Sequence, residues 1–231
     1  MISPKIGVSM DYVGKYIWRG QNLQDDSAFQ PSVSLTYGGL TAAIWGNLEM
    51  SNYNDNDGEI TEVDYSLDYT TPIPGLEILS ASMGVINYTF PNTELDDTTE
   101  IYGGLTLAVP LNPSIKLYRD VDDADGTYIA FGLSHSIEKI TEIAPDMPVG
   151  VTMSASLGWG SSAYNKFYWG LDDESCSDLV FKVGFPIPIG EWTLTPNLNY
   201  VTLVDDDIRR SDAFDSASDY FFAGINLFRQ F

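Results

Sequence analysis

Apolar and polar residues alternate strictly over residues 60–70, and this alternation limits the chain to few folds. One face carries Thr61, Val63, Tyr65, Leu67 and Tyr69, and the other carries Glu62, Asp64, Ser66, Asp68 and Thr70. Because a β-strand points successive side chains to opposite faces, a period of two predicts a strand. Three carboxylates cannot point into a dry core, so one face of this strand lies in water. The apolar face suits either lipid or a protein core.

The same alternation recurs along the chain, and short and long connections follow one another between the segments. We predict strands at 5–19, 28–37, 40–50, 60–70, 76–88, 99–109, 114–120, 126–137, 149–159, 178–187, 191–202 and 219–231. The short connections are 38–39, 71–75, 110–113, 138–148 and 186–190. The sequence therefore predicts an all-β fold, a single up-and-down antiparallel transmembrane β-barrel of about twelve strands. No linker divides the chain, so residues 1–231 form one domain.

The last thirteen residues contain an apolar row that ends the chain on an aromatic residue. Its members are Phe221, Ala223, Ile225, Leu227 and Phe231, interrupted by Arg229. An unpaired apolar edge strand recruits other chains, and closure of a barrel removes that edge. This ending resembles the terminal strand of bacterial outer-membrane barrels. A buried strand of a soluble β-sandwich is the alternative, but strands of ten to fourteen residues are longer than most strands in globular proteins.

Charge and hydropathy support the barrel. No apolar run approaches the roughly twenty residues of a transmembrane helix, so only a barrel could span a membrane. Thirty-three acidic and eleven basic residues give a net charge of −22, which argues against nucleic acid as a partner. More than half of the carboxylates lie in the long connections, 20–27, 51–59, 89–98, 121–125, 160–177 and 203–218. We expect a monomer in the bacterial outer membrane, in contact with phospholipid and lipopolysaccharide, with these acidic loops outside.

Aromatic residues lie near the ends of many predicted strands. They are Tyr16, Trp18, Tyr37, Tyr69, Trp159, Trp192, Tyr200 and Phe231. Transmembrane barrels carry aromatic girdles at both membrane interfaces. We therefore expect these residues to form two girdles.

Two segments resemble a known family. They are Asp11-Tyr-Val-Gly-Lys-Tyr-Ile-Trp-Arg-Gly20, followed by Gln30, and Tyr118-Arg-Asp-Val-Asp through Gly126-Thr-Tyr128. Both are similar to segments of Gram-negative outer-membrane porins of the TorF type. The resemblance implies an outer-membrane barrel and no catalytic residue.

The single histidine, His135, lies between Ser134 and Ser136. A Ser–His pair could indicate acyl transfer, but adjacent residues on a strand point to opposite faces. Ile137, which shares the face of His135, is apolar. We predict no catalytic residue and no enzyme activity.

Two acidic hairpin tips could bind a hard cation through oxygen ligands. One is Asn54-Asp-Asn-Asp-Gly58, and the other contributes Asp120, Asp122, Asp123 and Asp125. Neither has the full spacing of an EF-hand loop. Solvated loop tips and weak Ca²⁺ or Mg²⁺ sites both remain open, and no other cofactor is expected.

The polar strand faces place charged residues inside the predicted barrel. The candidate pore-lining residues are Asp11, Lys15, Arg19, Glu49, Glu62, Asp64, Asp68, Glu100, Lys116, Asp120 and Lys182. Twelve strands enclose an interior between that of a filled small barrel and that of an open porin. The sequence predicts a porin-like channel for passive diffusion of small hydrophilic or cationic solutes. The alternative is a non-conducting structural or interaction barrel whose acidic loops bind divalent cations, lipid headgroups or a partner protein.

Overall fold

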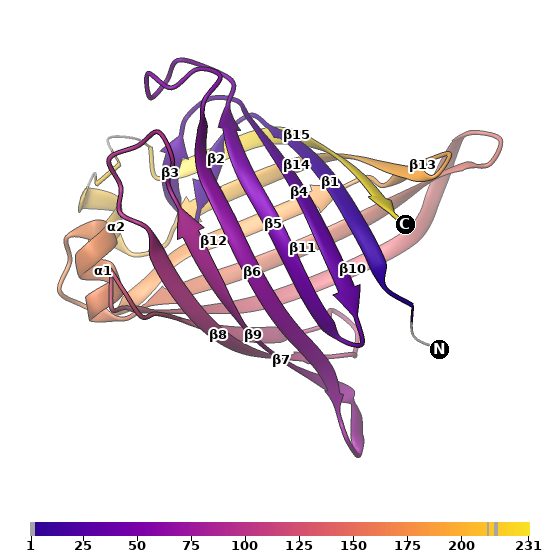
Figure 1. Ribbon diagram of the computed structural model, residues 1–231, viewed down its shortest axis with the longest axis horizontal. Coiled ribbons are helices and arrows are strands. Elements are labelled where there is room, and N and C mark those ends of the chain that lie inside the picture. Colours follow the sequence, from indigo (N-terminus) through magenta and orange to yellow (C-terminus); the bar gives the residue numbers. More distant parts are fainter. Residues whose placement is uncertain (1–2, 212, 215–216) are drawn as a thin grey trace.

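The computed structural model describes residues 3–211, 213–214 and 217–231, and it is a closed antiparallel barrel of twelve strands (Figure 1). The barrel strands are β1 (Lys5–Val13), β4 (Ala28–Tyr37), β5 (Leu40–Glu49), β6 (Ile60–Ile73), β7 (Leu76–Thr89), β8 (Thr98–Leu107), β9 (Ser114–Asp120), β10 (Thr127–Ala144), β11 (Met147–Gly160), β12 (Ser175–Gly184), β14 (Trp192–Leu203) and β15 (Asp219–Gln230). A short strand, β13 (Ile187–Ile189), pairs with β14 beyond β12. The predicted fold class is confirmed.

The first and last strands close the cylinder. Strand β1 pairs with β15 from Gly7↔Gln230 to Val13↔Gly224, while each remaining barrel strand pairs with its neighbours in the chain. Both termini therefore lie at the end with the short turns, here called the turn end (Figure 1). The opposite end, here called the loop end, carries the long connections. Closure leaves the apolar C-terminal strand paired on both sides.

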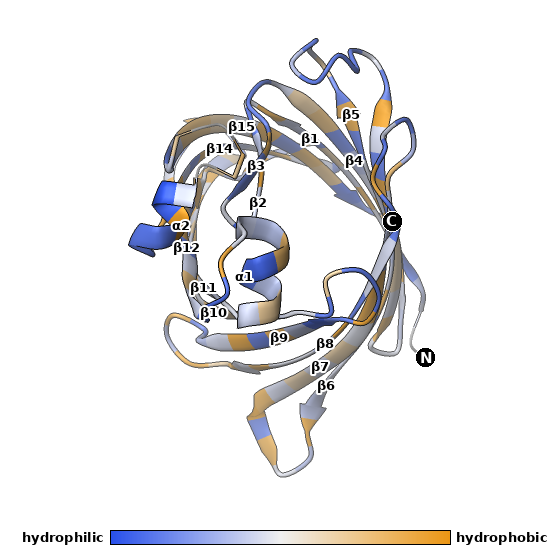
Figure 2. Ribbon diagram, turned by 90° about the vertical axis from the view of Figure 1, so that its left-hand side faces the viewer, coloured by the Kyte–Doolittle hydropathy of each residue, from blue (hydrophilic) through white to orange (hydrophobic). Residues whose placement is uncertain are grey.

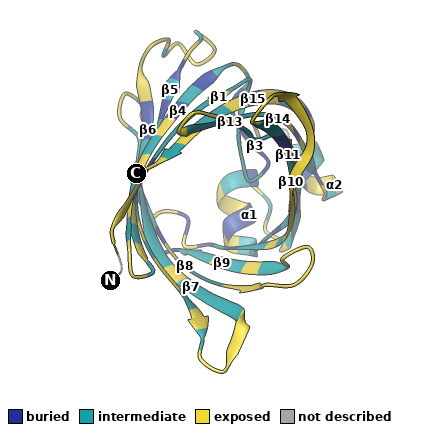
Figure 3. Cartoon of the chain, turned by 90° about the vertical axis from the view of Figure 1, so that its right-hand side faces the viewer, coloured by how far each residue is buried: buried dark blue, intermediate teal, exposed yellow. Residues whose placement is uncertain are grey.

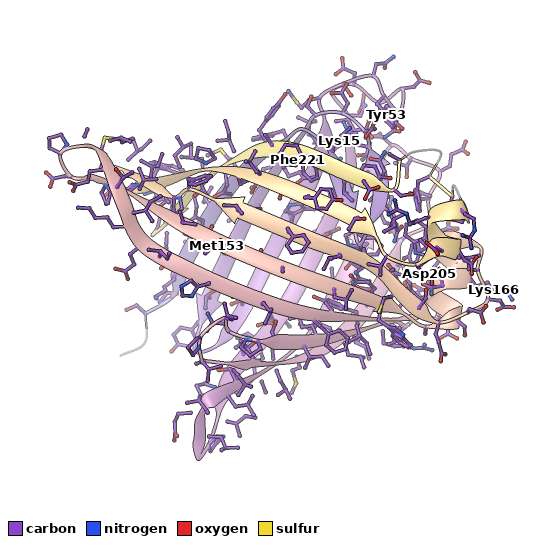
Figure 4. All side chains as sticks on the ribbon, turned by 180° about the vertical axis from the view of Figure 1, so that it is seen from behind. Lys15, Tyr53, Met153, Lys166, Asp205 and Phe221 are labelled. Carbon is purple, nitrogen blue, oxygen red and sulfur yellow. The ribbon has the colours of Figure 1, made fainter. Side chains whose placement is uncertain are left out.

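The apolar residues of the strands face outward. Leu67 is 44% exposed, and its cross-strand partners are Ala42 and Val85. Because cross-strand partners share a face of the sheet, the register extends this outward row around the barrel. Figure 4 shows Phe221 and Met153 on the outer wall. An apolar outer surface of this kind is stable against lipid.

The chain leaves the barrel wall earlier than the sequence predicts. Strand β1 ends at Val13, and residues up to 24 form a hairpin of β2 (Tyr16–Trp18) and β3 (Gln21–Gln24). Its turn places Arg19 at φ 49° and Gly20 at φ 82°, the positive values that a tight hairpin turn requires. A Cβ on Gly20 would also lie 2.7 Å from Leu203. The prediction of one strand over 5–19 is therefore wrong.

The predicted turn at 138–148 is also wrong. Strands β10 and β11 continue to pair as far as Ala144↔Met147, with irregular register after Ile137. The turn itself contains Asp146 at φ 62°. The long hairpin extends beyond the turn end of the barrel (Figure 1). Ile140 and Ile143 are exposed here and lie three positions apart, so the period of two is lost where the register becomes irregular.

Two short helices lie in the long connections. Helix α1 (Ser162–Trp169) begins after Ser161, whose side chain accepts a hydrogen bond from the Tyr164 N–H, and ends at Gly170 with φ 70°. Figure 2 shows α1 inside the barrel at the loop end, whereas α2 (Asp206–Ser211) lies at the rim. Neither helix, nor any other among the described residues, is long and apolar enough to cross a bilayer. Viewed from the turn end, α1 is seen within the ring of strands (Figure 3).

Candidate functional site: the lumen and its loop end

The β2–β3 hairpin crosses the lumen and is held to the far wall through Arg19. Its guanidinium donates two hydrogen bonds to the Glu100 carboxylate, each 2.7 Å long. The Tyr88 hydroxyl donates a third to Glu100 at 2.9 Å. The Arg19 and Glu100 side chains are only 9% and 3% exposed. Two parallel hydrogen bonds fix the orientation of both groups.

Aromatic rings surround the Arg19 guanidinium. Its central carbon lies 4.3 Å from the Trp18 ring centroid, 4.5 Å from that of Tyr118 and 4.3 Å from that of Tyr128. A cation over such faces is stabilised by the ring quadrupole. Burial by itself lowers the pKa of Arg19, but the Glu100 charge outweighs it and the pKa lies above its ordinary value. Arg19 is therefore a permanent positive charge inside the barrel.

Helix α1 packs against the same hairpin. The Tyr164 ring lies 5.3 Å from that of Tyr128 and 4.6 Å from that of Tyr168, and the latter lies 5.6 Å from Trp18. The Tyr164 hydroxyl also accepts a hydrogen bond from the Gln21 side chain at 3.1 Å. The hairpin and the helix thus form one packed body, here called the inner plug (residues 15–24 and 162–169), which narrows the lumen at the loop end.

The inner face of β6 carries a row of carboxylates. Glu62 accepts a hydrogen bond from the Tyr16 hydroxyl at 2.9 Å, and Asp68 accepts one from the Tyr102 hydroxyl at 2.6 Å. One oxygen of Asp64 is buried without a partner. Among the described residues, no Lys, Arg or His forms an ion pair with any of these three carboxylates. Burial, then Glu62 and Asp64, raise the pKa of Tyr16, so its hydroxyl remains a donor.

The remaining candidate pore-lining residues occupy different surroundings. Lys15 is paired with Asp25 at the base of the hairpin, and Figure 4 shows Lys15 at the loop end. Asp11 accepts hydrogen bonds from Ser9 and Asn226. Lys116 lies 4.4 Å from the centroid of the Tyr102 ring. Glu49 is buried and accepts a hydrogen bond from the Asn54 side chain. Lys182 lies opposite Ser154 and Asn199 on the neighbouring strands. The structure therefore joins Arg19 to Glu100, places Lys15 at the base of the hairpin and spreads the others along the wall.

The loop carboxylates predicted to bind metal do not converge. Buried Asp120 accepts hydrogen bonds from the Thr98 hydroxyl at 2.8 Å and the Asp122 N–H at 2.9 Å, while Asp125 is paired with Arg119. The described residues contain no group of three or more His, Cys, Asp or Glu side chains that could hold a metal ion. Weak binding of Ca²⁺ or Mg²⁺ at these loops stays a prediction.

His135 points to the outer wall. It pairs in register with Met153 and shares a shallow outer hollow with Met153 and Phe181. Ser134 and Ser136 occupy the alternate positions of β10 and face the other way. The arrangement does not form a Ser–His pair.

Two of the expected girdle residues lie inside the barrel instead. The Tyr16 ring packs against Trp45 at 5.7 Å, and the Trp18 ring packs against Tyr88 at 5.9 Å. This correction follows from the early end of β1. Sequence reasoning also missed Tyr164 and Tyr168, although Ser161 before a helical run and Gly170 after it are signals of helix α1.

No protein-family model and no curated protein sequence matches this chain, so the resemblance to porins of the TorF type is not confirmed. Among solved structures, LpxR from Salmonella typhimurium superposes with a TM-score of 0.56 and 10% sequence identity, over 97% of this chain and 99% of that chain. The present chain therefore has the fold of an outer-membrane β-barrel. An outer membrane channel from Pseudomonas putida F1 gives a TM-score of 0.49 and 11% identity, over 100% of this chain and 96% of that chain. Identities this low describe the fold alone.

Proposed function

We propose that this outer-membrane barrel is a narrow, cation-preferring channel for passive diffusion of small hydrophilic or cationic solutes. The observation that carries the proposal is the carboxylate row of β6, because Glu62, Asp64 and Asp68 have no basic partner among the described residues. Where they are ionised, carboxylates along a low-dielectric wall make the potential negative and raise the local concentration of cations.

The inner plug limits the size of the solute. The Arg19–Glu100 pair and the stacked rings of Trp18, Tyr164 and Tyr168 occupy the loop end of the lumen. Proteins and large sugars are therefore excluded from the lumen. Hydrated monovalent ions and small amines are the solutes best suited to the remaining path. We also propose that the protein acts as a monomer among phospholipid and lipopolysaccharide and that it has no catalytic role.

The same plug favours one rival function, a non-conducting barrel that displays acidic loops. In that case the packing of the hairpin against α1 seals the lumen completely. The two functions differ in one measurable quantity, the ionic conductance of a single inserted barrel.

A planar-bilayer recording tests the proposal. Purified protein is refolded, inserted into a bilayer and studied in a KCl gradient, with an established open porin as the control for insertion. Steady current steps with a reversal potential that indicates cation preference support the channel. Silence across many insertions, with protease-resistant folded protein recovered from the same bilayers, supports the non-conducting barrel.

A further inference from the structure

Two adjoining cavities lie at the loop end between the β2–β3 hairpin and the loops after β5 and β7. The first, of about 260 Å³, is polar, and its lining includes Tyr16, Gln24, Asn47, Glu49, Asn54 and Glu62. The second, of about 210 Å³, is mainly aromatic, and its lining includes Trp18, Tyr88, Phe90, Phe167, Tyr168 and Phe214. Leu23, Glu62, Phe90 and Leu95 line both cavities. Joined, they reach the lower part of the range of about 300–1,000 Å³ that is typical of ligand sites.

Two buried oxygen atoms that belong to residues of the polar cavity have no hydrogen-bond partner. They are Oε2 of Glu49 and Oε1 of Gln24, in side chains whose residues are 3% and 1% exposed. The other end of each group is fixed, because Glu49 Oε1 accepts from Asn54 at 3.0 Å and Gln24 Nε2 donates to the Ser27 carbonyl at 2.7 Å. A buried acceptor without a donor is costly. A ligand that donates hydrogen bonds would remove that cost.

The charges of the polar cavity specify the sign of that ligand. Its carboxylates are Glu49 and Glu62, and of the described residues that line it none is Lys, Arg or His. The two bases of the hairpin already form ion pairs, Lys15 with Asp25 and Arg19 with Glu100. The cavity therefore favours a positively charged donor.

The number of acceptors and the second cavity distinguish an organic cation from a metal ion. An ammonium group has three donors and no acceptor, which matches the free oxygens of Glu49 and Gln24 together with the Glu62 carboxylate. The described residues include no group of three or more His, Cys, Asp or Glu side chains that could hold a metal ion. The aromatic cavity next to Glu62 offers rings to an apolar body, and such rings also stabilise a nearby cation.

We propose that these joined cavities bind a small organic amine, with its ammonium group at Glu49, Gln24 and Glu62 and its apolar body against Trp18, Tyr88 and Phe167. This site shares Glu62 with the carboxylate row of β6, but binding of the amine does not require conduction. It makes the inner plug a receptor surface for arylalkylamines at the loop end of the barrel.

Isothermal titration calorimetry on the refolded barrel in nanodiscs tests the proposal with three probes. They are 2-phenylethylamine, its neutral analogue 2-phenylethanol, and CaCl₂ alone. We expect the amine to bind at least about tenfold more tightly than the alcohol, because only the amine pairs with the buried carboxylates. Equal affinities for the amine and the alcohol, or no amine binding at up to about 10 mM, would overturn the proposal.

Variants assign the binding to the cavity. The substitution Glu49→Gln should weaken amine binding at least about tenfold and leave alcohol binding unchanged. The matched control Glu94→Gln removes the same charge from an exposed position that does not line either cavity, and it should bind the amine like the unmodified protein. Equal losses of amine affinity in Glu49→Gln and Glu94→Gln would show that the amine is attracted only by the overall negative potential of the loops, and would overturn the proposed site.

The exposed side of the aromatic cavity supplies a second variant that should fold even if Glu49→Gln does not. Phe167 is 52% exposed on α1, and Phe167→Ala should weaken the amine and the alcohol by the same factor. An unchanged amine affinity in this variant contradicts the proposed pose. Calcium binding that depends on Glu49 and excludes the amine would instead identify an inorganic cation site and would also overturn the proposal. A barrel that binds the amine but does not conduct would refute the channel alone.

Discussion

Arg19 and Glu100 are 81 positions apart in the sequence, yet they form a buried ion pair with two hydrogen bonds of 2.7 Å. The pair joins the tip of an inward-folded hairpin to the wall strand β8. Transfer of two charges out of water is costly unless the geometry is good and the remaining acceptors are occupied. Here the Arg19 guanidinium donates to both oxygens of the Glu100 carboxylate, and the Tyr88 hydroxyl donates to the same carboxylate. The position of the hairpin therefore depends on this pair.

Loss of Arg19 should destabilise the barrel because it leaves a buried carboxylate without its counter-charge. The substitution Arg19→Met removes the charge and keeps most of the length of the side chain. We expect the free energy of unfolding to fall by about 3–5 kcal/mol. Urea unfolding of the protein in lipid vesicles, followed by the loss of resistance to protease, measures this change.

The double variant Arg19→Met/Glu100→Gln is the control. It removes both charges, so most of the stability lost in Arg19→Met should return. Additive losses from the two single variants would show that the two charges do not interact energetically.

The outer and inner faces of β6 should respond differently to a new charge. Leu67 faces outward in the middle of β6, whereas neighbouring Ser66 faces the lumen. The substitution Leu67→Arg should destabilise the barrel by about 2–4 kcal/mol, because it places a charge in the middle of the lipid layer. Ser66→Arg should cost less, since its charge can reach water in the lumen. Equal changes in the free energy of unfolding, measured in the same vesicles, would contradict the assignment of the two faces.

The orientation in the membrane is testable by labelling intact cells. Transmembrane barrels keep short turns in the periplasm and longer loops outside. In a Cys176→Ser background, a cysteine at the exposed position of Asp206 in α2 should react with a membrane-impermeant maleimide. A cysteine at exposed Glu77, next to the short turn between β6 and β7, should react only after the outer membrane is permeabilised. Labelling of Glu77→Cys alone in intact cells would reverse the orientation.

The wall of the barrel could be predicted from the sequence because its physical signals are local. Each strand is specified by a hydrophobic period of two and by the Gly- or Pro-rich turns that end it. Carboxylates on one face show which face contacts water. The register follows, since a slip of one residue would turn every apolar side chain of a strand toward water. The largest differences lie at Val13 and Ala144. The other boundaries of the barrel strands shift by at most three residues.

The inner plug could not be predicted in the same way because it depends on contacts between distant residues. Tyr16 and Trp18 continue the alternation of β1, and only the Arg19–Gly20 turn shows that the chain reverses there. The partners of Arg19 come from β8, β9 and β10, on the far side of the barrel. No short pattern in the sequence records such an arrangement, although Ser161 and Gly170 did mark the ends of α1.

The ion preference of the channel should depend on the carboxylates of β6. Replacing Glu62, Asp64 and Asp68 together by Gln, Asn and Asn removes three ionisable carboxylates and keeps the size of the side chains. Glu62 and Asp68 can still accept hydrogen bonds from Tyr16 and Tyr102 after the change, so the barrel should fold. The reversal potential in a KCl gradient should move toward zero, because the negative potential that concentrates cations is reduced. The cation preference of the unmodified protein should likewise decrease at 1 M salt, where the screening length is about 3 Å.

The matched control is Glu94→Gln/Asp96→Asn/Asp97→Asn, which removes three charges from the loop after β7 and should change the reversal potential less. A reversal potential that indicates anion preference, or one that the β6 variant leaves unchanged, would show that these carboxylates do not line the conducting path.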